Sequence, residues 1–97
     1  MQKHLECKVY GSVHGVGFRE TTASSAKDLG LVGYVQNEPY GVHVVAEGDE
    51  SVLREFFEKL HVGSAYSRVE RIEEKWSEAA GAFKDFRIRY RNFLDRL

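Results

Sequence analysis

The segment from residue 11 to residue 19 combines three glycines with an arginine and could bind an anion. It reads Gly-Ser-Val-His-Gly-Val-Gly-Phe-Arg and joins an alternating apolar run to a stretch with helical spacing. Glycines allow the backbone N–H groups of such a turn to converge, and the first turn of a helix adds N–H groups without intrahelical acceptors. This combination suits a phosphate group.

Arg19 would supply the positive charge in this loop. It lies at the start of the expected helix, where the macrodipole disfavours a cation by about 0.3–1 kcal/mol, and a bound anion would remove that conflict. A guanidinium can also bind two oxygens of one phosphoryl group, which adds orientation to charge. The charge pattern alone leaves a second interpretation open, in which Arg19 is a surface residue paired with Glu20 or another carboxylate.

Other common kinds of site lack support in the sequence. No Gly-Lys-Ser/Thr follows the glycines, as a Walker A loop requires, and the third glycine of the dinucleotide fingerprint is missing. The four histidines and the single cysteine are dispersed and match no metal motif, so we expect no metal site. Cys7 shares the apolar side of its strand, which predicts a buried, inert thiol.

Five strands and two helices are expected to position the loop. Leu5, Cys7 and Val9 alternate with polar residues, which indicates a half-buried strand. Between residues 52 and 60, apolar side chains recur at helical spacing after Asp49, a candidate N-cap. The complete set is strands at about 4–12, 33–37, 42–46, 68–77 and 84–90, with helices at about 20–29 and 50–60. Residues 38–41 form a hairpin turn, and the charged segment 68–77 suits a sheet edge.

The order of elements predicts the fold class. It is βαββαβ with a possible extra strand, the ferredoxin-like (split βαβ) α+β sandwich. We expect an antiparallel sheet of four to five strands with two helices on one face. Residues 1–97 are expected to form a single domain, with a core over about 4–90 and a tail, 91–97, that no pattern assigns. The fold alone selects no function, because it hosts enzymes, RNA-binding domains and regulatory modules.

Composition narrows the classes of partner. The 97 residues carry 14 Lys and Arg against 15 Asp and Glu, so no global field attracts nucleic acid or an anionic membrane. No apolar run approaches the roughly 18 residues of a membrane span, and the first residues lack the apolar stretch of a signal peptide. With only one cysteine, no internal disulfide can form. We therefore expect a cytoplasmic monomer that binds neither nucleic acid nor membrane.

The glycine-rich segment closely resembles the first signature of the acylphosphatase family, G-x-V-x-G-V-x-F-R. Residues 11–19 match it at every fixed position. Residues 33–37, Gly-Tyr-Val-Gln-Asn, match the opening of the family's second signature, and residues 44–48 resemble the strand that follows it. The similarity covers about 4–90. One departure occurs in the hairpin, which is one residue shorter than the family's and has no Asp before Gly41.

The resemblance implies hydrolysis of acyl phosphates to a carboxylate and inorganic phosphate without a metal or cofactor. An acyl phosphate is already activated, so the enzyme mainly positions substrate and water and stabilises phosphoryl charge. By this resemblance Asn37 orients the attacking water, and an amide suits that role because it donates and accepts while remaining uncharged. The resemblance also implies that the phosphoryl group is held by the Arg19 side chain and by the backbone amides of His14, Gly15, Val16, Gly17, Phe18 and Arg19.

Structural interpretations of the same residues remain open from the sequence. Asn37 could form an Asx turn at a strand end, the glycines could only bend the chain, and the His14 side chain is expected to be a solvated loop residue. The alternative function is a non-catalytic, anion-binding or regulatory ferredoxin-like domain. The expected small-molecule partners are the acyl phosphate substrate and inorganic phosphate.

Overall fold

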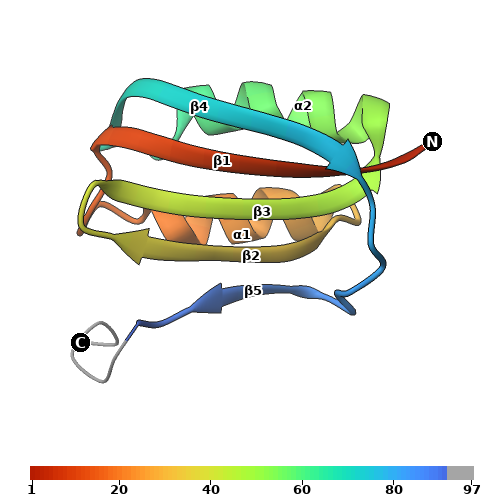
Figure 1. The fold of residues 1–97 in the computed structure, drawn as a ribbon. Helices are drawn as coiled ribbons and strands as arrows, with labels where there is room; N and C mark the ends of the chain where they lie inside the picture. The colour runs from red at the N-terminus through yellow and green to blue at the C-terminus, as the bar shows by residue number, and fades with distance from the viewer. Residues whose placement is uncertain (92–97) are drawn as a thin grey trace.

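Five strands form one sheet in the order β4-β1-β3-β2-β5, and two helices cover one of its faces (Figure 1). The computed structural model describes residues 1–91. The strands are β1 (Gln2–Ser12), β2 (Val32–Glu38), β3 (Gly41–Asp49), β4 (Arg68–Glu78) and β5 (Phe86–Arg89), and the helices are α1 (Phe18–Asp28) and α2 (Glu50–Val62). The ferredoxin-like α+β fold expected from the sequence is confirmed, and the charged strand β4 lies at an edge as predicted.

One part of the prediction is wrong, because the sheet is mixed rather than wholly antiparallel. The first four strands pair antiparallel, but β5 pairs parallel to β2 with Gly33 opposite Phe86. The physical reason is the path of the chain after β4. That strand ends at the end of the sheet where β2 begins, and residues 79–85 pass along this end to the far edge (Figure 1). The chain therefore enters β5 in the same direction as β2.

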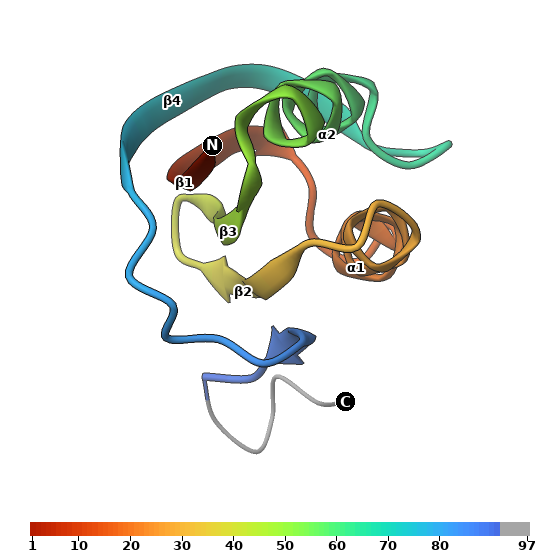
Figure 2. The ribbon, with the colours of Figure 1, turned by 90° about the vertical axis from the view of Figure 1, so that its right-hand side faces the viewer.

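The core lies between the sheet and the helices, as Figure 2 shows end-on. Leu5, Cys7 and Val9 of β1 lie opposite Ala46, Val44 and Val42 of β3, and all six side chains are buried. From α2, the residues Leu53, Phe56 and Leu60 are buried against this surface, as their spacing predicts. Complete burial of an aliphatic or aromatic side chain of this size contributes about 1.5–3 kcal/mol, so these contacts orient α2 on the sheet.

The ends of the helices follow local capping chemistry. The Asp49 side chain accepts a hydrogen bond from the Ser51 amide at 3.2 Å, which confirms the predicted N-cap of α2. Gly30 follows α1 with a φ of 71°, the left-handed conformation expected after a helix end. The first helix begins at Phe18 rather than at residue 20, because Gly17 takes a φ of 77° and occupies the N-cap position. The strands β1 and β3 are longer than the sequence predicted.

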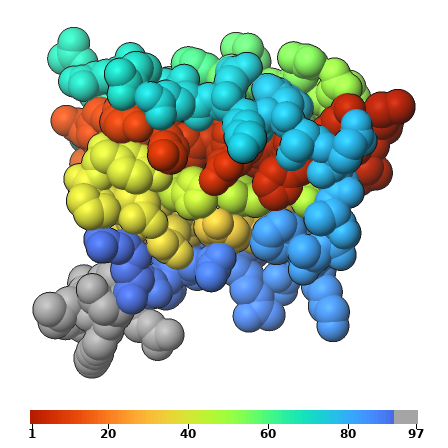
Figure 3. All heavy atoms as spheres, viewed as in Figure 1, coloured from red at the N-terminus to blue at the C-terminus, as the bar shows by residue number. Residues whose placement is uncertain are grey.

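The second face of the sheet, which faces the viewer in Figure 3, carries no helix of the described residues, and polar side chains such as His43 and Glu6 pair on it. Glu47 is buried there, with its carboxylate 2.6 Å from His4 Nδ1. It also accepts hydrogen bonds from the amides of Ala80 and Gly81 at 3.1 and 3.0 Å, and so holds residues 79–85 on the sheet. Among residues 1–91, no helix is long and apolar enough to cross a membrane. Most of the tail, residues 92–97, lies outside the described residues.

Candidate active site

The loop between β1 and α1 presents a series of backbone N–H groups. Gly15 and Gly17 have φ values of 69° and 77°, which only glycine adopts without strain. Within the described part of the chain, the amides of residues 14–18 donate to no acceptor, and the first helical bond runs from Thr21 N to Gly17 O at 3.0 Å. Alternating right- and left-handed residues that leave successive N–H groups open form an anion-binding nest. The loop therefore has the backbone chemistry to bind a phosphoryl group.

Phe18 anchors the start of α1 and with it the position of Arg19. The Phe18 side chain is only 1% exposed, whereas Arg19, the next residue, is half-buried. The Arg19 guanidinium carbon lies 5.2 Å from the centre of the Tyr90 ring, just after β5. This distance is within the range of a cation–π contact. The arginine that the sequence singled out thus lies directly after the nest.

Asn37 lies at the carboxyl end of β2, on the face of the sheet that the helices cover. It pairs with Val42 of β3, and Val42 pairs in turn with Val9 of β1, so these three side chains share one face. The Asn37 Oδ1 atom is buried. Alternation directs Glu38 to the other face, so its carboxylate does not oppose an anion beside Asn37. Since β1 and β2 run in parallel, their carboxyl ends bring Asn37 and the loop to the same end of the sheet (Figure 1).

A side chain of the loop contacts the hairpin that follows Asn37. The His14 side chain is exposed, as expected for a loop histidine, but its Nε2 atom also lies 2.5 Å from the carbonyl oxygen of Gly41. The hairpin closes through Pro39 and Tyr40, with Glu38 paired to Gly41. At Gly41, which has a φ of 154°, an added Cβ would lie 2.0 Å from the Val9 carbonyl oxygen, so no other residue fits there. The shorter hairpin still holds Asn37 in the register of the sheet.

Sequence reasoning missed Ser64 and Tyr90. The Ser64 hydroxyl donates to the Val16 carbonyl oxygen at 2.7 Å, although 48 residues separate them. No motif could have identified this contact, because it depends on how α2 packs and so on where residues 63–67, which follow α2, lie relative to the loop. Tyr90 could have been suspected only from the alternation of aromatic residues in the last strand.

The other candidate groups do not form a reactive centre. Cys7 is completely buried as predicted, and burial, with smaller contributions from Glu74 and Glu6, raises its pKa to about 12. A thiol with such a high pKa is a poor nucleophile at neutral pH. In the part of the chain that the structure describes, no three His, Cys, Asp or Glu side chains are grouped as metal ligands.

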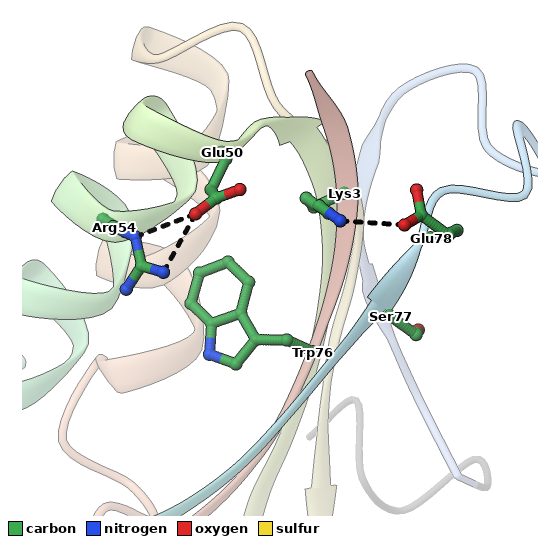
Figure 4. Close-up of a pocket in the computed structure, with 6 residues that line it drawn as sticks. All are labelled: Lys3, Glu50, Arg54, Trp76, Ser77 and Glu78. Atoms are coloured by element: carbon green, nitrogen blue, oxygen red, sulfur yellow. Dashed lines mark hydrogen bonds and ion pairs between the residues drawn. The ribbon is translucent and has the colours of Figure 1, made fainter.

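A hollow of about 490 Å³ lies near the opposite end of the strands, where β1 begins and β4 ends (Figure 4). Its charges are paired with one another. Lys3 binds Glu78 at 2.8 Å and Arg54 binds Glu50 at 2.9 Å. The Arg54 guanidinium also lies 4.9 Å from the Trp76 ring centre. These contacts account for the side chains of the hollow without a ligand.

Comparisons with known proteins identify relatives along nearly the whole chain. The family model described as acylphosphatase matches residues 5–88. An acylphosphatase of Caldanaerobacter subterraneus is 42% identical over 89 residues, which cover 91% of this chain and 99% of that protein. One of Methanococcoides burtonii is 46% identical over 85 residues, covering 87% and 88% respectively. The crystal structure of acylphosphatase from Bacillus subtilis superposes with a TM-score of 0.85 at 35% identity and covers 93% of this chain and 100% of that one.

Proposed function

The chain belongs to the acylphosphatase family and hydrolyses acyl phosphates, and on this premise we propose that the 14–19 loop, Arg19 and Asn37 form its catalytic site. The observation that carries the proposal is the nest of N–H groups at residues 14–18, directly before Arg19 and at the same end of the sheet as Asn37. Both signatures of the sequence thus meet at one place in the fold.

In this site the phosphoryl group of the substrate binds the loop amides and the Arg19 guanidinium. These donors are oriented before the reaction and act on the oxygens that carry charge in the transition state. The Asn37 side chain holds the water in line for attack on phosphorus. The water oxygen bonds to phosphorus, the bond from phosphorus to the acyl oxygen breaks, and the products are a carboxylate and inorganic phosphate. Because carboxylate is a good leaving group, the site needs no strong base.

The charge that stabilises the phosphoryl oxygens comes from the chain itself. Arg19 adds a full positive charge to the partial positive charge at the start of α1. The proposed reaction is therefore independent of metal and cofactor. The substrate of this reaction is a small acyl phosphate. The proposal includes a single domain over residues 1–97 that acts as a monomer in the cytoplasm. The near-neutral charge of the chain disfavours nucleic-acid and membrane partners, and its single cysteine is compatible with a reducing compartment.

A steady-state assay with benzoyl phosphate after treatment with a chelator tests this proposal. We expect release of inorganic phosphate at an undiminished rate, with inorganic phosphate as a competitive inhibitor. Turnover that the chelator abolishes would contradict the metal-free mechanism. Binding of phosphate without any turnover would instead favour the alternative, a non-catalytic or regulatory anion-binding domain. Light scattering of the full chain checks the monomer.

A further inference from the structure

The connection between α2 and β4, residues 63–67, contacts the outer side of the glycine-rich loop. The Ser64 hydroxyl donates a hydrogen bond of 2.7 Å to the Val16 carbonyl oxygen, and this contact is partly buried. Figure 2 shows the connection passing beside α1 on the side away from β2, the strand that carries Asn37. Ser64 belongs to this connection and Asn37 belongs to β2, so the two residues reach the loop from different elements.

The connection is itself held in one conformation. The Ser67 hydroxyl oxygen accepts a hydrogen bond from the Ser64 amide at 2.8 Å and donates to the Ser64 carbonyl at 3.0 Å. The Ser67 amide donates to the same carbonyl at 3.1 Å. At Gly63, which has a φ of 68°, an added Cβ would lie 2.3 Å from Ser67 Oγ and 3.3 Å from the Phe18 ring. Ser64 is thus supported from within its own turn, which reduces the entropy lost when it binds the loop.

The bond from Ser64 determines the orientation of the peptide between Val16 and Gly17. This peptide is trans, and in a planar trans peptide the C=O and N–H groups point in opposite directions. When the Val16 carbonyl points to Ser64, the Gly17 N–H points away from the connection. The reverse orientation would turn the carbonyl oxygen toward a bound phosphate and the N–H away from it. Flanking glycines make such a flip easy, since they adopt either conformation.

We propose that Ser64 is a positioning residue that holds the Val16–Gly17 peptide so that the Gly17 N–H binds a phosphoryl oxygen. This inference rests on the proposed phosphate site. Ser64 does not touch the substrate and acts only through the loop. Its contribution belongs to binding of the phosphoryl group, in both the substrate complex and the transition state, rather than to activation of water.

A pair of nearly isosteric variants tests the hydroxyl itself. Ser64→Thr keeps the hydroxyl donor, whereas Ser64→Val removes the donor with a side chain of almost the same volume as threonine. For Ser64→Val we expect the inhibition constant of inorganic phosphate and the KM for benzoyl phosphate to rise about tenfold, the scale of one lost hydrogen bond to a charged oxygen, with a much smaller change in kcat. Ser64→Thr should retain the wild-type constants. Ser77→Val is the matched control, because it removes a hydroxyl from an exposed residue of β4 in the same way.

A second readout observes the amide directly. In a titration of ¹⁵N-labelled protein with inorganic phosphate, the Gly17 resonance should shift strongly in the wild type and in Ser64→Thr and weakly in Ser64→Val. Unchanged phosphate inhibition in Ser64→Val, or an equal defect in Ser64→Thr, would overturn the inference. If Ser64→Val lowers the unfolding midpoint, Ser64→Ala replaces it, and its phosphate inhibition and Gly17 shift are compared with those of the wild type and Ser64→Thr. The Arg19→Ala variant separates the two proposals. If Arg19→Ala is still inhibited by phosphate, the proposed phosphate site is refuted. If Arg19→Ala loses phosphate inhibition but Ser64→Val is inhibited like the wild type, only the role of Ser64 is refuted.

Discussion

The Nε2 atom of His14 lies 2.5 Å from the carbonyl oxygen of Gly41, and this contact joins the glycine-rich loop to the hairpin that carries Asn37. A carbonyl only accepts hydrogen bonds, so the Nε2 atom carries the proton and donates. The contact links the two parts of the proposed site, one that binds the phosphoryl group and one that holds the water.

Removing this donor should loosen the hairpin relative to the loop. For His14→Leu we expect kcat to fall about tenfold, because small displacements of a positioning group are costly, while inhibition by phosphate changes little. His14→Gln, which retains a donor, should keep more of the activity. His61→Leu makes the same replacement on α2, where the imidazole contacts the Phe57 carbonyl and ring, and serves as a control. A kcat for His14→Leu equal to that of His61→Leu would show that the contact does not position Asn37.

Arg19 and Asn37 should differ in the constants that they change. Arg19→Ala removes the side chain that binds the phosphoryl group, so we expect a higher KM, a lower kcat and weaker phosphate inhibition. Asn37→Ala should lower kcat by about 10²-fold or more with little effect on phosphate inhibition, as expected for a group that acts mainly in the transition state. Steady-state kinetics with benzoyl phosphate separate the two patterns. A folded Asn37→Ala protein with near-normal kcat would remove this residue from the mechanism.

A side chain at Gly15 should obstruct the nest. A Cβ at this position would meet nothing within 4 Å, but the φ of 69° strains any other residue and can turn the amides away from a ligand. We expect Gly15→Val to weaken phosphate inhibition. Gly30→Val provides the matched control, because Gly30 has a φ of 71°, equally open surroundings and a place outside the loop. If both variants bind phosphate like the wild type, the loop glycines only shape the turn.

Cys7 should contribute to stability and not to turnover. It is completely buried in the core, and its pKa is raised to about 12. For Cys7→Ala we expect an unchanged kcat and a loss of about 1 kcal/mol in the free energy of unfolding, because only one sulfur atom leaves the core. Denaturant unfolding and the benzoyl phosphate assay measure the two quantities. An inactive but folded Cys7→Ala protein would give the thiol a role in catalysis.

Glu47 should make the stability of the fold depend on pH. Burial by itself raises the pKa of Glu47, but hydrogen bonds from His4, Ala80 and Gly81 outweigh it, and the net pKa lies below the ordinary 4.5. A carboxyl group whose pKa is lower in the folded state than in the unfolded state stabilises the fold at every pH above its unfolded-state pKa. This stabilisation is lost as the pH falls through the pKa of the folded state. We therefore expect Glu47→Gln to cost about 2 kcal/mol at pH 7 and progressively less below about pH 4.5.

Urea unfolding at pH 7, 5 and 3 measures this dependence. The exposed Glu70 of β4 provides a control, and Glu70→Gln should leave the unfolding free energy nearly unchanged. An equal loss for Glu47→Gln at all three pH values would show that the charge of the carboxylate is not what anchors residues 79–85.

Much of the fold could be predicted because its elements carry local patterns. The alternation of Leu5, Cys7 and Val9 predicted β1, and the apolar spacing from Val52 to Leu60 predicted α2. The direction of β5 could not be predicted in the same way. Its pairing with β2 depends on the path of residues 79–85, which the buried carboxylate of Glu47 holds, and a carboxylate at a strand position usually indicates solvent.

The residues that could bind a phosphoryl group were recognisable without a structure, because the glycines at 15 and 17, the start of α1 and Arg19 are neighbours along the chain and their chemistry is local. The surroundings of that loop became visible in the folded protein alone. The His14 contact with Gly41 and the Ser64 contact with Val16 join segments far apart in sequence, and a single hydrogen-bonding residue leaves no periodic signal. Such contacts arise when parallel strands and packed helices bring distant ends together, so they depend on the whole fold and not on any one segment.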